Sequence, residues 1–461
     1  MFNKKDLMAL MAQQLNKVAP ITETTFSDDS EKIIIPKNMD KKTASEELMR
    51  QYESEEEEVD VSQSYDWDWQ DTLHAIKKVS ENTFGWIQGK TIHSFFGSSR
   101  PTYIQICTDI KDGKKVYEEC FYGNSVISSW EDADMSISIN RAGKVGINLT
   151  CKKRYKTRVL KFLKSVDEFI KENSIYLNKA IMVKSHRNYG IELEILEVKT
   201  NPNIVLNQIS AKTINNYIIN ELTQPKKRTY LFTGAYGNGK SETAMNIAEK
   251  ALEKGLTFFY VENTDYVKNA IDVALKYSTP EKGVLVFAED IDQKASGSQR
   301  DAEMNSFLNQ IDGVTAKGRN IKTILTTNHA NKISQALRRP GRIDIVVAFD
   351  NPSRSESIQI IKNFCGSALR DIDWDTLDIV DNVSASVIAE ACKRANTYKS
   401  HTKGIISHDD LQVALTSMVR QAQYMAEDLE EDHTIETAIS RIFSPVFSPI
   451  IDKLEHIEES M

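Results

Sequence analysis

The arrangement of apolar and polar positions separates two regions with different periodicities. Residues 64–200 contain two stretches with helical spacing of apolar residues, 69–79 and 155–170, together with several short strand-like runs. Those runs cover residues 102–108, 115–122, 135–139, 145–150, 180–183 and 191–198. Because Asp112-Gly113 and Ala142-Gly143 separate consecutive runs, we expect antiparallel hairpins. The pattern predicts an α+β domain over residues 64–200.

From about residue 204, fully apolar runs alternate with helical segments, which is typical of a parallel sheet built from β-α units. The predicted strands of this sheet are residues 229–233, 257–261, 284–288, 323–327 and 345–349. Residues 353–427 then have helical periodicity throughout. We therefore predict an α/β domain over residues 201–352, followed by a small helical subdomain over residues 353–427.

Both ends of the chain differ from this body in composition. Residues 21–60 hold thirteen acidic and five basic residues, and this excess equals the net charge of −8 of the whole chain. We predict a flexible acidic region over residues 1–63; apolar residues at helical spacing near its start leave a docking helix for a partner open. Residues 428–461 are predicted to be an acidic tail that packs on the body or binds a partner.

The composition excludes several classes of protein. No apolar run approaches the length of a membrane span, and the start of the chain lacks the continuous apolar core of a secretory signal. The five cysteines are an odd number without a C-x-x-C pair, which is typical of a reducing compartment. We expect a cytoplasmic protein without a membrane span.

Residues 234–241, with the sequence GAYGNGKS, stand between a predicted strand and a predicted helix. This is the spacing and the context of a loop that wraps phosphate groups with its backbone N–H groups. Lys240 is expected to reach the β- and γ-phosphates, and the hydroxyl of Ser241 to bind Mg²⁺. The sequence thus predicts a site for ATP and Mg²⁺. The predicted nucleotide-binding residues are Gly234, Gly237, Asn238, Gly239, Lys240, Ser241 and Glu242.

A pair of adjacent acids, Glu289 and Asp290, ends the apolar run 284–288. Hydrolysis of a nucleoside triphosphate needs one acid to hold Mg²⁺ and another to orient the attacking water. We predict Glu289 as a metal ligand together with Ser241, and both acids as catalytic residues; which of the two orients the water stays open. Asp292 is expected to support the same loop.

With these motifs in place, the sequence resembles the AAA ATPases, within the AAA+ superfamily and its strict AAA clade. That family usually has Asp-Glu at the acid pair, whereas this chain has Glu-Asp. The reversed order resembles the mitochondrial AAA translocase of the Rieske protein. The resemblance implies a P-loop NTPase fold with a five-stranded parallel sheet, the AAA+ core, beside a separate N-terminal α+β domain. It also identifies residues 353–427 as the family's helical lid, with residues 384–386 next to the nucleotide.

The resemblance assigns further residues downstream. Asn328 matches the family's sensor beside the γ-phosphate, and residues 305–314 are similar to its inter-subunit signalling segment. Arg339 and Arg342 match two catalytic arginines that point into the nucleotide site of the neighbouring subunit. An arginine supplied in this way requires a head-to-tail interface, and such an interface forms a ring when it closes. We therefore expect a homo-oligomer, by family resemblance a hexamer.

These features favour an ATP-hydrolysing ring that remodels, disassembles or chaperones a protein client bound by residues 64–200. Two alternatives stay open: a nucleic-acid motor or loader, suggested by the basic run 152–158, and a nucleotide-gated scaffold without turnover. Residues 262–271 lack the aromatic-hydrophobic-Gly loop with which many AAA proteins thread a polypeptide, although Tyr266 supplies an aromatic ring there. No H-E-x-x-H motif is present, so a fused metalloprotease is excluded.

Overall fold

The computed structural model describes most of the chain between residues 46 and 423. The described residues are 46–47, 49–50, 53–85, 88–89, 92–94, 97–99, 102–131, 133–140, 143–186, 190–279, 281–291, 319–329, 341–380, 382–398 and 404–423. They fall into two compact units, one drawn from residues 1–197, 252–286 and 315–321, the other from residues 198–251, 287–314 and 322–461.

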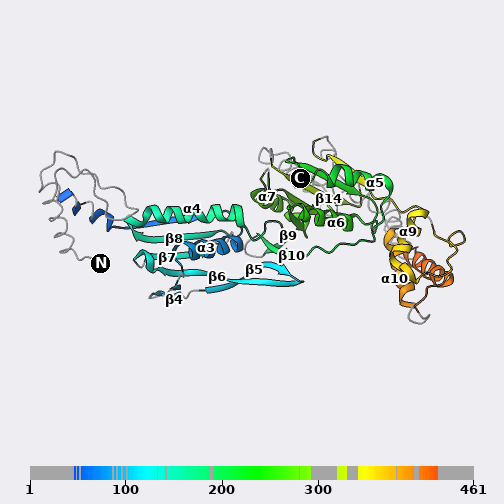
Figure 1. Cartoon of the computed structure of the whole chain (residues 1–461), viewed down its shortest axis with the longest axis horizontal. Coiled ribbons are helices and arrows are strands. Elements are labelled where there is room, and N and C mark those ends of the chain that lie inside the picture. Colours follow the sequence, from blue (N-terminus) through cyan, green and yellow to red (C-terminus); the bar gives the residue numbers. More distant parts are fainter. Residues whose placement is uncertain are drawn as a thin grey trace, which may run out of the picture. The chain divides into compact units, whose positions relative to one another are not determined.

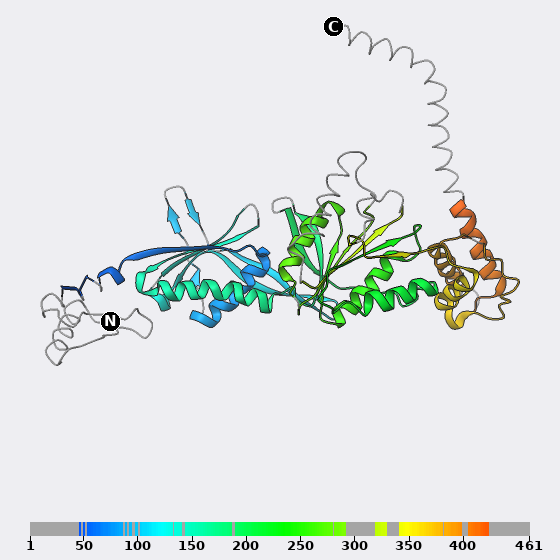
Figure 2. The same cartoon turned by 90° about the horizontal axis from the view of Figure 1, so that it is seen from above.

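The first unit contains an antiparallel sheet with two helices on one face (Figures 1 and 2). Its strand order is β1-β8-β7-β6-β2, and β5 pairs with β6. The helices are α3 (Trp69–Phe84) and α4 (Lys156–Asn173). The strands are β1 (Glu58–Ser64), β2 (Gln88–Gly89), β5 (Thr102–Lys111), β6 (Lys114–Ile127), β7 (Ala133–Ile139) and β8 (Val145–Lys152), with a separate hairpin of β3 (Ile92–Ser94) and β4 (Gly97–Ser99).

Alternating burial along β8 explains why helices cover this sheet. Val145, Ile147 and Leu149 are fully buried, whereas the residues between them are more accessible. Both helices contact this strand, and α4 buries residues such as Phe162 and Val166 at spacings of three and four. The buried face of the strand, formed by every second residue, therefore packs against the apolar face of the helices, formed by residues three and four apart.

The prediction of a flexible region over residues 1–63 is wrong for its last residues, because β1 pairs antiparallel with β8. Just before β1, the carboxylate of Glu56 accepts a hydrogen bond from Lys152 at 2.6 Å and also binds Arg154. Arg154 binds Glu131 as well. Composition alone favoured disorder here, since the basic partners of this acid lie about a hundred residues further along the chain.

The second sheet has the strand order β10-β9-β12-β13-β14-β11-β15. The strands are β9 (Ala180–His186), β10 (Gly190–Leu196), β11 (Arg228–Thr233), β12 (Thr257–Val261), β13 (Val284–Ala288), β14 (Ile321–Thr327) and β15 (Ile345–Ala348). All strands expected for the α/β domain are present, and β11 is parallel to both β14 and β15.

The prediction of five parallel strands is incomplete, because the observed sheet contains further strands and is mixed. β9 pairs in parallel with β12, while β10 pairs antiparallel with β9. Both strands were assigned to the α+β domain from their position in the chain. Alternation of apolar and polar residues shows that a strand has one buried face, but it does not select the sheet that the strand joins.

Helices follow the strands of this second region. They are α5 (Gln208–Thr213), the π-helix η3 (Ile214–Ile219), α6 (Lys240–Glu253) and α7 (Val267–Tyr277). The helical subdomain contains α9 (Arg354–Cys365), α10 (Ala385–Tyr398) and helical residues 408–423. Its core includes Ile361, Ala391 and Leu411, all fully buried. The structure describes residues 353–380, 382–398 and 404–423 of the lid expected over residues 353–427, and we keep the name lid for them. Short 3₁₀ helices are η1 (Ser128–Trp130), η2 (Lys153–Tyr155), η4 (Thr264–Tyr266) and η7 (Gly366–Ala368).

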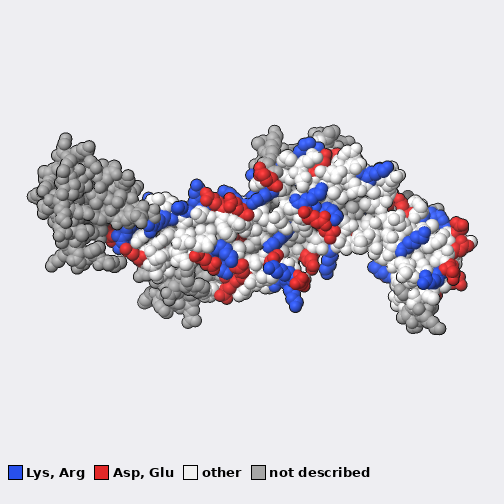
Figure 3. Space-filling model, viewed as in Figure 1, with Lys and Arg blue, Asp and Glu red and all other residues white. Residues whose placement is uncertain are grey.

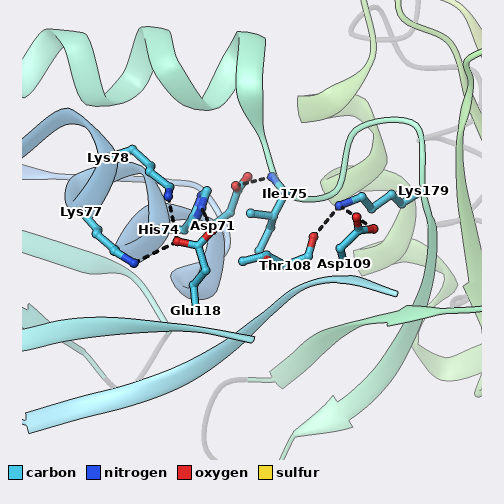
Figure 4. A network of polar contacts seen from close by, with 9 residues as sticks. All are labelled: Asp71, His74, Lys77, Lys78, Thr108, Asp109, Glu118, Ile175 and Lys179. Atoms are coloured by element: carbon cyan, nitrogen blue, oxygen red, sulfur yellow. Dashed lines mark hydrogen bonds and ion pairs between the residues drawn. The ribbon is translucent and has the colours of Figure 1, made fainter. Parts of the chain in front are cut away.

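Two buried carboxylates tie the start of α3 to other elements of the first unit. Asp68 caps α3 and accepts a hydrogen bond from the hydroxyl of Tyr176 at 2.7 Å. Asp71 accepts bonds from the backbone N–H of Ile175 at 3.0 Å, drawn in Figure 4, and from the hydroxyl of Tyr277 at 3.1 Å. Burial raises the pKa of Asp68 to about 6 and the pKa of Asp71 to about 7.

The raised pKa of Asp71 predicts a pH-dependent stability. Between its ordinary pKa of 3.8 and its folded pKa of about 7, the folded chain keeps a proton that the unfolded chain has lost. The free energy of unfolding should therefore fall as the pH rises through this window. Asp71→Asn should reduce that fall, because Asn cannot ionise and still accepts from Ile175. Urea unfolding at pH 5 and pH 8, followed by tryptophan fluorescence, measures the effect.

Asp112→Asn is the matched control for this experiment, because Asp112 is exposed and has a left-handed backbone that Asn tolerates. Its unfolding should keep the pH dependence of the original protein. An Asp71→Asn variant with an unchanged pH dependence would show that the buried proton is not held at this carboxylate.

Candidate nucleotide site

The loop of residues 234–239 joins β11 to α6 and depends on its glycines. Gly234, Gly237 and Gly239 have φ angles of 148°, 78° and 83°, which other residues rarely adopt. A Cβ on Gly234 would lie 2.1 Å from the backbone oxygen of Phe349, and a Cβ on Gly237 would lie 2.0 Å from Oγ of Ser386. The loop therefore passes too close to the end of β15 and to the lid for larger residues.

We predict that Gly234→Ala lowers the free energy of unfolding by about 2–4 kcal/mol, because it combines a strained φ with a collision against backbone. Gly239→Ala is the control, since its Cβ would meet only Ile204, at 4.0 Å. That variant has the strain of a positive φ without the collision and should lose less stability. Chemical denaturation of both variants makes the comparison; equal losses would contradict the steric argument.

Lys240 begins α6 and is only 6% exposed. Its Nζ donates to the backbone oxygens of Gly234 at 2.8 Å and Ala235 at 2.9 Å, and to Oδ1 of Asn328 at 2.7 Å. The ring centroid of Tyr236 is 5.9 Å from the same nitrogen. An ammonium group has three N–H donors, so these acceptors match its full capacity. They hold the charge between the backbone of the loop and Asn328.

Asn328 follows β14 and connects Lys240 to the acid pair. While its Oδ1 accepts from Lys240, its Nδ2 donates to Oδ1 of Asp290 at 2.8 Å. The backbone N–H of Asp290 donates to Oγ1 of Thr326 at 2.9 Å, and Asp290 has a left-handed φ of 48°. The adjacent Glu289 is half-buried. Residues far apart in sequence thus form a continuous chain from the loop lysine to a carboxylate.

Helix α10 of the lid begins in contact with the same loop. The backbone N–H of Ser386 donates to the oxygen of Gly237 at 2.9 Å, and the N–H of Ala385 donates to Oδ1 of Asn238 at 3.1 Å. Residues 384–386, expected next to the nucleotide, therefore contact the phosphate loop. The partners Thr326 and Phe349 were not singled out in the sequence, since each looks like an ordinary strand residue.

The structure describes only some of the remaining predicted site residues. Ser241 and Glu242 lie in the first turn of α6, and Arg342 lies in the turn before β15. Arg339, Asp292 and residues 305–314 lie outside the described residues.

The donors and acceptors of the site fit a nucleotide with a divalent cation. The start of α6 and the ammonium of Lys240 present positive charge to the inside of a glycine loop, which suits phosphate oxygens. Ser241 and Glu289, the predicted metal ligands, carry oxygen atoms of the kind that Mg²⁺ prefers. The fold, with a glycine loop between a strand and a helix, is that of the P-loop NTPase class.

Residues 230–351 match the model of the ATPase family associated with various cellular activities (AAA). Residues 230–351 are thus similar to the AAA domain, and members of the AAA family are generally ATPases. The resemblance expected from the sequence motifs is confirmed at this level.

Curated relatives are similar to part of this chain. A probable mitochondrial chaperone, bcs1, of Schizosaccharomyces pombe is 29% identical over 164 residues, which are 34% of this chain and 35% of the relative. A 26S proteasome regulatory subunit 4 homolog of the same organism is 30% identical over 153 residues, 30% of this chain and 33% of the relative. A 26S proteasome regulatory subunit 8 homolog B of Arabidopsis thaliana is 25% identical over 224 residues, 43% of this chain and 51% of the relative.

The chain spans between a third and about half of the length of these relatives. The similarity to these relatives therefore covers less than half of this chain. In the part of the chain that the structure describes, no helix has both the length and the apolar character needed to cross a bilayer.

Proposed function

We propose that this protein hydrolyses ATP with Mg²⁺ in a ring of identical subunits, and that the ring remodels, disassembles or chaperones a protein client. The observation that carries the proposal is the chain of contacts Lys240–Asn328–Asp290, which joins a phosphate-binding group to a carboxylate through one amide. Each member has the chemistry that phosphoryl transfer to water requires.

Roles follow from these positions. Lys240 exchanges its loop acceptors for phosphate oxygens, and Asn328 then holds its amide between the γ-phosphate and Asp290. Asp290 is the acid that orients the attacking water, since Asn328 fixes its Oδ1. Glu289 and Ser241 would hold Mg²⁺. When bound, Mg²⁺ neutralises charge on the β- and γ-phosphates.

Separate variants of the two acids test this division of roles. Asp290→Asn should lower kcat by about a hundredfold at saturating Mg²⁺ with ATP affinity retained, because the water loses its orienting carboxylate. Glu289→Gln should instead shift the Mg²⁺ concentration needed for half-maximal activity upward by about tenfold, because a ligand charge is lost. Steady-state hydrolysis against Mg²⁺ concentration separates the two. If the two variants have exchanged phenotypes, the assignment is reversed; if both hydrolyse normally, the site is wrong.

The client is proposed to be a protein, bound by the α+β region of residues 64–200. The relatives include a probable mitochondrial chaperone and proteasome regulatory subunit homologs, and this supports a protein client. The basic run 152–158 gives little support to a nucleic-acid partner, because Lys152 and Arg154 already pair with Glu56 and Glu131. On the face shown in Figure 3, basic and acidic side chains are interspersed.

Trapping experiments discriminate these partners. A hydrolysis-arrested Glu289→Gln/Asp290→Asn protein should retain its client in the presence of ATP, and mass spectrometry identifies what is retained. Stimulation of hydrolysis by DNA or RNA that disappears at high salt would instead favour a nucleic-acid motor. A protein that binds ATP without turnover under every condition would be a nucleotide-gated scaffold.

A further inference from the structure

Asn238 lies within the phosphate loop, yet its side chain makes its hydrogen bonds outside that loop. The residue is 6% exposed. Its Nδ2 donates to the backbone oxygen of Phe349 at 3.2 Å and to Oδ1 of Asn351 at 2.9 Å. Its Oδ1 accepts from the backbone N–H of Ala385 at 3.1 Å. One amide thus bonds to two segments that are distant from each other in sequence.

The first of these segments, residues 349–353, connects the sheet to the lid. It begins after β15 and ends where α9 starts at Arg354. The backbone N–H of Phe349 donates to the oxygen of Thr233 at 2.7 Å, so the start of this connection is fixed to the strand that leads into the phosphate loop. Asn351 in turn donates from Nδ2 to the oxygen of Asn382 at 2.9 Å, just before α10.

The second segment is the start of α10 itself. Its first N–H groups have no partner within the helix and need acceptors from outside. The loop supplies two: Oδ1 of Asn238 for Ala385 and the backbone oxygen of Gly237 for Ser386. Both halves of the Asn238 amide are therefore used, the donor half by the connection and the acceptor half by the lid helix.

We propose that Asn238 is a positioning residue that couples occupancy of the phosphate loop to the position of the lid. This inference rests on the proposed nucleotide site. Lys240 bonds to the backbone oxygens of Gly234 and Ala235, so a lysine drawn to phosphate releases two carbonyls of the loop that carries Asn238. The loop then readjusts, and the Asn238 amide moves the connection and the start of α10 with it.

Amide hydrogen exchange of the full chain, with and without ADP and Mg²⁺, reads this coupling at Ala385 and Ser386. In the original protein, nucleotide should slow exchange at these amides by about tenfold. In Asn238→Ala the effect should fall below about twofold when ADP is saturating for that variant, so that any loss of affinity is removed from the comparison. A residue that only binds nucleotide would show the full response at saturation.

Other variants test the donor and the acceptor of the Asn238 amide one at a time. Asn238→Asp keeps an oxygen for Ala385 but loses the donors to Phe349 and Asn351. Its Ala385 amide should stay protected without nucleotide, and the response to nucleotide should be lost. Asn351→Ala should weaken the response as well, and it keeps the proposal testable if a loop variant fails to fold. Thr397→Ala is the control, because Thr397 lies near the other end of α10, where its hydroxyl donates to the backbone oxygen of Lys393, and this variant should respond like the original protein.

Two results would overturn the coupling. In the first, Asn238→Ala keeps the full exchange response to nucleotide. In the second, it loses nucleotide affinity as severely as Lys240→Ala, which would make Asn238 a binding residue only. If the original protein itself binds no nucleotide, the proposed function fails, and the coupling fails with it.

Discussion

Lys240→Ala is expected to remove measurable ATP hydrolysis, with a fall in kcat of about 10²–10³ and a large loss of ATP affinity. The substitution removes the one charge that the loop holds in place, and it leaves three acceptors, on Gly234, Ala235 and Asn328, without their donor. Unmatched oxygen atoms would then face the phosphates. Calorimetric titration with ATP and a phosphate-release assay measure the two losses.

Lys250→Ala is the matched control for this substitution. Lys250 lies near the end of the same helix, away from the phosphate loop, so its loss should leave hydrolysis within about twofold. Lys240→Arg tests whether a positive charge at this position is sufficient for activity. A planar guanidinium keeps the charge but does not reproduce the compact ammonium, so activity should remain low. Hydrolysis at the original rate in Lys240→Ala would rule out this loop as the catalytic site.

The sequence predicted the strands of the nucleotide region closely because most of them are buried on both faces. A run such as β13, with every residue buried, needs only apolar residues and no particular partner. β14 is instructive, since the expected strand began at residue 323 and the observed one begins at Ile321. The charged residue Lys322 interrupts the apolar run at the start of this strand, so the sequence pattern places the start too late. Its ammonium is nevertheless buried and donates to the backbone oxygens of Gln224 at 2.9 Å and Lys226 at 2.6 Å. Burial lowers the pKa of Lys322 to about 8.

The order of motifs along the chain predicted which site residues belong together, but it did not predict how they connect. Lys240 and Asn328 are 88 residues apart, and Asn328 and Asp290 are 38 apart. Asp290 and Asn328 lie close together because the neighbouring strands β13 and β14, which they follow, end on the same side of the sheet. The bonds of Asn238 to the lid could not be anticipated, because an Asn in a glycine-rich loop equally suits an ordinary turn.

The same reasoning explains the errors in the N-terminal region. Acidic residues before β1 look like solvated chain until Lys152 and Arg154 are brought beside them. β9 and β10 follow an α+β region in the sequence, yet β9 pairs with β12. In both cases the deciding partner is distant in sequence, and local composition or alternation carries no information about it.

Loss of both arginines of residues 339–342 should lower hydrolysis by about 10³, as for an arginine supplied to a neighbouring site. Mixing separates this effect from misfolding. A chain with Arg339→Ala and Arg342→Ala keeps an intact phosphate loop, whereas a Lys240→Ala chain keeps intact arginines. Each protein alone should be inactive. In an equal mixture about one interface in four joins an intact loop to intact arginines, so about a quarter of the original activity should return.

This recovery has no explanation if each subunit holds a complete site, because adding one inactive protein to another then gives no activity. Dilution below the concentration at which subunits associate should abolish the recovered activity, since the active interface exists only in the assembly. A mixture of either variant with a chain carrying all three substitutions is the control and should stay inactive. Activity of the arginine variant alone at the original rate would contradict the shared site, and with it the main reason to expect a ring.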